Sequence, residues 1–130
     1  MDVGGTNARV MLSKIQDNKR NEVLLNSVYK TADYESIEGV IQDVLDKNKF
    51  EIDCCVLSLG GPRVGNCINI TQCHHWPTVD GKAVQERFNF PKLFLLNDFE
   101  AAGYGVLNNK GNINDLFIVT KKLFRLLRGA

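Results

Sequence analysis

The chain of 130 residues has almost no excess of charge of one sign and no long apolar run. Its 16 basic and 15 acidic side chains leave a formal net charge of +1, whereas a nucleic-acid-binding protein usually carries a basic face or stripe. No apolar stretch approaches the roughly 20 residues of a membrane-spanning helix, and no secretory signal peptide precedes Asp2. We therefore expect a soluble, cytoplasmic protein without nucleic-acid or membrane partners.

Internal repeats and low-complexity tracts are also lacking, and the composition is that of one ordinary globular domain, with 44% hydrophobic and 24% charged residues. Two of the four cysteines, Cys54 and Cys55, are neighbours in an apolar strand-like run, so their side chains point to opposite faces and suit packing. A second cluster, Cys67 with Cys73-His74-His75, matches no usual zinc-ligand spacing. We expect reduced thiols, and the role of this cluster stays open.

The first part of the chain has the pattern of a hairpin followed by a helix. Strands are expected over 9–15 and 22–30, joined by a polar turn at 16–21. Asp33 or Ser36 is available as the cap of the helix that follows. Its apolar stripe is formed by Ile37, Val40, Ile41, Val44 and Leu45.

The second part alternates strands with short helices. We expect strands over 54–59, 92–96 and 116–119, a hairpin arm over 64–70, and helices over 80–88 and 99–107. In the helix over 80–88, Asp80 lies near the start, and Ala83, Val84 and Phe88 should face inward.

Polar residues follow three of the expected strands. Asp2 belongs to the end of a first strand. Gly60-Gly61 follows the strand over 54–59, and Asn97-Asp98 follows the strand over 92–96. A mixed sheet with helices against it belongs to the α/β class. In such sheets ligands bind beyond the carboxyl ends of the strands, so these residues should form one site.

The segment Gly4-Gly5-Thr6-Asn7 has the composition of a phosphate-binding turn. Glycines let backbone N–H groups approach an anion, and Thr6 and Asn7 can add side-chain donors. An aspartate beside the turn, here Asp2, can hold Mg²⁺ against phosphate oxygens. A glycine pair also occurs in plain β-turns, which is the alternative interpretation.

Asn97-Asp98 offers the groups that phosphoryl transfer to an alcohol needs. A carboxylate at the end of a rigid strand can accept the hydroxyl proton, and Asn97 can donate to and accept from neighbouring sugar hydroxyls. Asp98 also precedes a helical stretch, so it can instead be an N-cap that binds the amides near Ala101. Both roles can hold in one fold.

With these motifs the chain resembles the bacterial-type glucokinases over roughly residues 2 to 110. The matching segments are Asp2 through Arg9, Leu59 through Pro62, Thr71 through Gly81, and Leu95 through Ala101. The resemblance implies a ribonuclease-H-like, actin-like ATPase fold, with a mixed sheet and flanking helices, as the small lobe of a two-lobe sugar kinase. It also implies ATP-dependent phosphorylation of glucose at its 6-hydroxyl, with Mg²⁺ as cofactor and a homodimer as a possible assembly.

The resemblance assigns roles residue by residue. Asp98 would be the base and would contact the substrate together with Asn97, and Trp76 would pack rather than stack on a sugar. The other substrate-binding residues would be Gly60, Gly61, Pro62, Thr71 and Gln72, the last standing where the family has Asn. The ATP phosphates would be bound by Asp2, Gly4, Gly5, Thr6 and Asn7, with Asp2 near Mg²⁺.

The chain departs from the family at both ends. Only Met1 precedes the segment Asp2 through Thr6, where the family has several apolar residues, so the first strand should be very short and leave an exposed position in the sheet. We expect residues 1–115 to correspond to the small lobe and residues 116–130 to be a divergent basic and apolar tail, truncated or non-native. The large lobe that completes the family's site has no counterpart, so we expect little kinase activity from these residues alone. The alternatives are another hexose kinase of the superfamily and a non-catalytic sugar-sensing domain.

Overall fold

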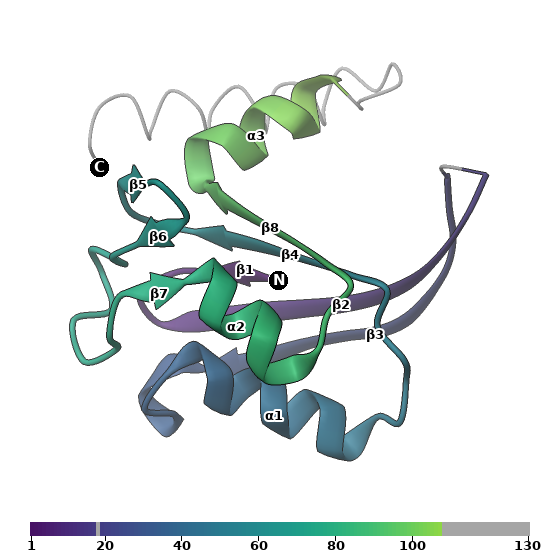
Figure 1. The fold of residues 1–130 in the computed structure, drawn as a ribbon, viewed down its shortest axis with the longest axis horizontal. Coiled ribbons are helices and arrows are strands. Elements are labelled where there is room, and N and C mark those ends of the chain that lie inside the picture. The colour runs from purple at the N-terminus through teal and green to yellow at the C-terminus, as the bar shows by residue number, and fades with distance from the viewer. Residues whose placement is uncertain (18, 108–130) are drawn as a thin grey trace.

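The fold is taken from a computed structural model that describes residues 1–17 and 19–107, and it is built on a five-stranded mixed sheet (Figure 1). Its strands are β1 (Asp2–Val3), β2 (Asn7–Gln16), β3 (Lys19–Lys30), β4 (Cys54–Leu59) and β8 (Lys92–Asn97). They lie in the order β3-β2-β1-β4-β8, in which β1, β4 and β8 are parallel and β2 and β3 form an antiparallel hairpin. The predicted hairpin and mixed sheet are thereby confirmed.

The other elements flank this sheet. The 3-10 helix η1 (Thr31–Asp33) leads into α1 (Ile37–Lys47), and α2 (Gly81–Phe88) and α3 (Asp98–Leu107) come before and after β8. Three two-residue strands, β5 (Arg63–Val64), β6 (Cys67–Ile68) and β7 (Val79–Asp80), form a small antiparallel sheet. In Figure 1, α1 lies below the long strands and α3 above the end of β8. None of the helices within residues 1–17 and 19–107 is long and apolar enough to cross a membrane.

Helix α1 forms where the apolar stripe predicts it. Ile37, Val40, Ile41 and Val44 are buried against the sheet. The N-cap is Ser36, whose Oγ accepts a hydrogen bond from the Gly39 amide at 3.4 Å, whereas Asp33 belongs to η1. The cap satisfies one of the amides that the first turn leaves without a helical partner.

Helix α2 is capped by Asp80, whose Oδ1 accepts from the amides of Lys82 and Ala83 at 3.0 and 3.3 Å. Its inward side carries Gly81, Val84 and Phe88. The prediction that Ala83 also faces inward is wrong, because this side chain is exposed. Positions 81, 84 and 88 recur at helical spacing and form one stripe that faces the core. Position 83 lies on the opposite side of the helix and faces solvent.

The hydrophobic core lies between the sheet and the first two helices. Val3, Leu57 and Leu59 are completely buried, and Trp76 belongs to the same buried cluster, with its Nε1 donating to the Tyr34 carbonyl at 2.9 Å. Trp76 is therefore a packing residue, as predicted. The larger set of buried residues includes Ala8, Val10, Val40, Ile41, Val44, Ile68, Ile70, Val79, Val84, Phe90 and Leu95.

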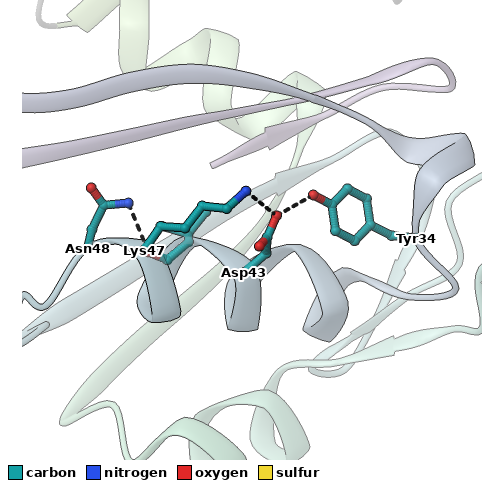
Figure 2. Close-up of polar contacts among 5 residues, drawn as sticks. Tyr34, Asp43, Lys47 and Asn48 are labelled. Atoms are coloured by element: carbon teal, nitrogen blue, oxygen red, sulfur yellow. Dashed lines mark hydrogen bonds and ion pairs between the residues drawn. The ribbon is translucent and has the colours of Figure 1, made fainter.

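A polar cluster on α1 fixes the segment that enters this helix (Figure 2). The Tyr34 hydroxyl donates to Asp43 Oδ2 at 2.6 Å, and Lys47 Nζ donates to the same oxygen at 3.1 Å. The hydrogen bond to Asp43 raises the pKa of Tyr34 to about 12. The same bond, followed by the one from Lys47, lowers the pKa of Asp43 from 3.8.

These two shifts predict a pH-dependent stability that Tyr34→Phe removes. Since the folded state lowers the pKa of Asp43, its contribution is present above about pH 3.8 and is lost as the pH falls further. Since the folded state raises the pKa of Tyr34, its contribution is lost as the pH rises from 10.0 to about 12. Urea denaturation across pH should show the wild-type advantage over Tyr34→Phe shrinking at both extremes. Lys47→Gln should keep the alkaline change, and an advantage that is constant with pH would contradict the prediction.

A gap lies at the centre of the sheet, because β1 has two residues and its neighbours β2 and β4 have ten and six. An apolar cavity of about 80 Å³ opens there, lined by Met1, by strands β2 and β4 and by α1. The Met1 ammonium donates to the Val56 carbonyl at 2.7 Å, and burial lowers its pKa from 8.0. Burial also raises the pKa of the neighbouring Cys55 thiol to about 11. The predicted short first strand is confirmed.

An apolar extension at this point should stabilise the fold. If Val-Leu-Val is joined to Met1, the β1 register places these residues between Met11–Ser13 and Cys54–Val56, with the leucine facing the cavity. New sheet hydrogen bonds and apolar burial, less the cost of ordering three residues, should raise the free energy of unfolding by about 2 kcal/mol. Urea denaturation measures the change, and Gly-Ser-Gly of the same length is the control. Equal effects of the two extensions would contradict the prediction.

Candidate functional site

The carboxyl ends of three parallel strands lie side by side at one edge of the main sheet. Val3 of β1 is paired with Leu59 of β4, and Leu59 is paired with Asn97 of β8. The residues that follow, Gly4, Gly60 and Asp98, therefore leave the sheet at the same level. The structure thus brings together the three polar segments that the sequence analysis placed at strand ends.

The Asp98 carboxylate lies between β4 and the turn that follows it. Ser58 Oγ donates to Asp98 Oδ1 at 3.2 Å. A Cβ atom added to Gly60 would stand 3.1 Å from Asp98 Oδ2, so the glycine leaves the room that the carboxylate occupies. Ser58 is only 8% exposed. Ser58 is not among the residues predicted from the sequence motifs, although its hydroxyl is the polar group in the apolar run of β4.

The cap of α3 is supplied by Asn97 rather than by Asp98. The Glu100 amide donates to Asn97 Oδ1 at 2.7 Å, which is the bond expected between an N-cap and the third helical residue. The alternative in which Asp98 is the N-cap is therefore wrong. The capping bond engages Asn97 Oδ1, and the amide nitrogen of this side chain remains the group suited to a hydroxyl oxygen.

The turn after β4 is fixed by tight backbone contacts. The amide and hydroxyl of Thr71 both donate to the Gly60 carbonyl, at 2.9 and 3.0 Å. Gly61 lies directly against the carbonyl oxygen of Asn69, so no side chain fits there. Pro62 is exposed beyond this point. The predicted substrate residues at 60–62 and Thr71 thus belong to one rigid corner beside Asp98.

An ion pair connects this corner to α3. Arg63 Nε lies 3.1 Å from Glu100 Oε1, and its Nη1 donates to the Leu95 carbonyl at 3.4 Å. Arg63 belongs to β5, Leu95 to β8 and Glu100 to the first turn of α3. The side chain therefore links the small sheet to the strand and helix that position Asp98.

The glycine turn between β1 and β2 is held by its carbonyl groups. The Gly4 amide donates to the Asn7 carbonyl at 2.9 Å. Thr31 donates its hydroxyl to the Gly5 carbonyl at 2.8 Å and its amide to the Thr6 carbonyl at 3.0 Å. The side chains of Thr6 and Asn7 are exposed. The Gly4 amide is thus used within the turn, so the predicted anion donors that the turn presents to solvent are the side chains of Thr6 and Asn7.

Gln72 lies against the glycine turn. A Cβ atom added to Gly5 would meet the backbone oxygen and the Cβ of Gln72, both at 2.8 Å. The Gln72 side chain is exposed. This contact joins the predicted phosphate-binding turn to the segment that carries the predicted substrate residues Thr71 and Gln72.

The cysteine and histidine cluster does not form a metal site within the described residues, where no group of three metal-ligating side chains occurs. Cys73 is buried, and its Sγ lies 3.7 Å from His75 Nδ1. His75 Nε2 lies 3.0 Å from the Thr31 carbonyl. Cys67 is in β6, paired with Asp80, and all four cysteines are free. The contacts of His75 connect its loop to Thr31 and, through Thr31, to the glycine turn.

Asp2 stands beside this site at the end of β1. It is paired with Ser58 in the parallel ladder, so both side chains point to the same face of the sheet. One carboxylate fits Mg²⁺, which keeps most of its waters and binds protein through one or two carboxylates together with substrate phosphates. The donor set at this edge is thus compatible with a magnesium ion that a nucleotide brings with it.

Three comparisons with known proteins agree with each other. The glucokinase family profile matches residues 1–121. The chain is 37% identical over 106 residues to a glucokinase of Agrobacterium fabrum, covering 81% of this chain and 30% of the relative. It is 32% identical over 112 residues to a glucokinase of Brucella abortus, covering 85% and 31%.

The fold comparison gives the same result. A crystal structure of glucokinase from an Antarctic psychrotroph superposes with a TM-score of 0.74 at 25% identity, covering 85% of this chain and 35% of that one. The predicted small-lobe sugar-kinase fold is thereby confirmed. The chain spans about a third of the length of the relatives it matches. The predicted strand over 116–119 and the predicted division into residues 1–115 and 116–130 lie outside the described residues.

Proposed function

Since this chain belongs to the glucokinase family, we propose that it forms the N-terminal part of an ATP-dependent kinase that phosphorylates the 6-hydroxyl of glucose. The observation that carries the proposal is the Asp98 carboxylate. It stands at the end of β8, accepts a hydrogen bond from Ser58, occupies the room that Gly60 leaves, and lies on the same sheet edge as the glycine turn. A proton acceptor beside a phosphate-binding turn is what phosphoryl transfer to an alcohol requires.

In this proposal Asp98 accepts the proton of the 6-hydroxyl while the oxygen of that hydroxyl bonds to the γ-phosphorus of ATP. The bond from that phosphorus to the bridging oxygen breaks, and ADP carries the electron pair away. A carboxylate suits the task because its position is fixed by a strand end and by the Ser58 hydroxyl.

The other substrate contacts follow from the same corner. The Asn97 amide nitrogen donates to a sugar hydroxyl while its Oδ1 caps α3. Gly60, Gly61 and Pro62 shape the wall of the sugar site, and Thr71 and Gln72 lie next to them. Thr71 donates its own proton to Gly60, so toward glucose its hydroxyl can act only as an acceptor.

ATP binds through the glycine turn. Gly4, Gly5, Thr6 and Asn7 would contact the phosphates, and Asp2 would hold Mg²⁺ directly or through water. When bound, the metal ion offsets the negative charge that develops on the phosphoryl group. Thr31 keeps the turn in place by binding two of its carbonyls. We place the reaction in the cytoplasm, where thiols such as the four free cysteines stay reduced.

A chimera tests the proposal, because the chain spans only about a third of its relatives. The chimera is the Agrobacterium fabrum glucokinase in which the segment aligned with this chain over 106 residues is exchanged for the corresponding residues of this chain. Formation of glucose 6-phosphate from ATP and glucose, at a higher kcat/KM than with fructose, supports the proposal. A folded chimera that binds glucose without transferring phosphate contradicts it and favours a sensing domain. The unaltered relative is the control.

A further inference from the structure

Among residues 1–17 and 22–104, two polar side chains are buried, Thr31 at 1% exposure and Ser58 at 8%. Each of them binds a part of the proposed site. Thr31 binds the carbonyls of the glycine turn, and Ser58 binds the carboxylate of Asp98. A hydroxyl taken out of water costs free energy unless it is hydrogen-bonded. The position of the Ser58 hydroxyl in a core strand therefore requires an explanation.

The sheet itself does not need the hydroxyl of Ser58. Its backbone amide donates to the Met1 carbonyl at 2.8 Å, and its pairing partners are Asp2 on one side and Leu96 on the other. Its neighbours Leu57 and Leu59 are completely buried apolar residues. An alanine would complete the same ladder without the cost of burying a polar group. What the hydroxyl adds is the bond to Asp98 Oδ1.

We propose that Ser58 is a positioning residue for Asp98, an inference that rests on the proposed function. The Ser58 hydroxyl in β4 donates to Asp98 Oδ1. Gly60, which follows β4, leaves room for Asp98 Oδ2. Together they fix the side-chain torsion of Asp98 and aim one carboxylate oxygen at the substrate. Asp98 directly follows Asn97, the strand position paired with Leu59, so this contact depends on the β4–β8 register.

Two further carboxylates lie on the elements next to Asp98. Glu100, two residues after Asp98 in the first turn of α3, is paired with Arg63 of β5. Asp2 of β1 is paired with Ser58 in the ladder and faces the same side of the sheet. Strand β4 thus lies between the strands that carry Asp2 and Asp98. The hydrogen bond from Ser58 orients the Asp98 carboxylate.

The test uses the full 130-residue chain, so that it does not depend on kinase activity. Three-bond NMR couplings between Hα and Hβ of Asp98 report whether its side chain occupies one rotamer or several. We expect one dominant rotamer in the wild type and averaged couplings in Ser58→Ala. Ser58→Thr keeps the hydroxyl and should retain the wild-type couplings. Ser58→Cys keeps the volume with a weak donor and should resemble Ser58→Ala.

The outcomes separate this inference from the proposed function. Wild-type couplings in both Ser58→Ala and Ser58→Cys, in chains that remain folded by circular dichroism, would overturn it. In the active chimera, Ser58→Ala should lower kcat about tenfold with little change in KM. Ser58→Thr, which keeps the hydroxyl, should have a kcat close to that of the unaltered chimera. A chimera without activity would count against the proposed function, and the NMR couplings would still decide the role of Ser58.

Discussion

Asp98→Asn in the chimera is expected to lower kcat about a thousandfold while changing the glucose Kd less than about threefold. The amide has nearly the shape of the carboxylate and can still accept the Ser58 hydrogen bond, but it cannot take the proton of the 6-hydroxyl. Steady-state phosphorylation kinetics and calorimetric glucose binding give the two quantities. The split between them distinguishes a base from a residue that only binds sugar.

The matched control is Glu100→Gln, which also replaces a carboxylate with an amide in the first turn of α3. Its partner Arg63 is 41% exposed, and a pair this open to solvent contributes little. The capping bond uses the Glu100 backbone amide and is unaffected. We expect kcat within about threefold of the wild type. Equal losses in both variants would mean that α3 is sensitive to any charge change, and the assignment of Asp98 as the base would fail.

The sequence predicted those parts of the fold that depend on local patterns. The apolar stripe of α1 has the helical period, and the apolar run of β4 ends at a glycine pair, so both elements were expected and found. The meeting of Asp2, Gly60 and Asp98 at one edge followed from a rule about parallel strands. None of these inferences required knowledge of which residues face each other.

The contacts inside the site depend on register, which a single sequence does not determine. Ser58 and Asp98 are 40 residues apart, and they meet only because Leu59 is paired with Asn97. The choice between Asn97 and Asp98 as the cap was also open, since both side chains favour that position. The helix begins one residue after the strand ends, and this abrupt change assigns the cap to Asn97.

Gly61→Ala is expected to lower the free energy of unfolding by about 3 kcal/mol, more than an ordinary surface change. The added methyl group would overlap the backbone oxygen of Asn69, and a backbone atom cannot move aside as a flexible side chain does. The corner that carries Gly60 and Thr71 would have to shift, and the site with it. Gly103→Ala is the control, because no atom of residues 1–17 and 19–107 outside the neighbouring helix backbone lies within 4 Å of its added methyl group, and alanine favours a helix. It should stabilise the chain by about 0.5–1 kcal/mol. Urea denaturation of the 130-residue chain measures both, and a Gly61→Ala variant as stable as the wild type would show that this corner is not rigid.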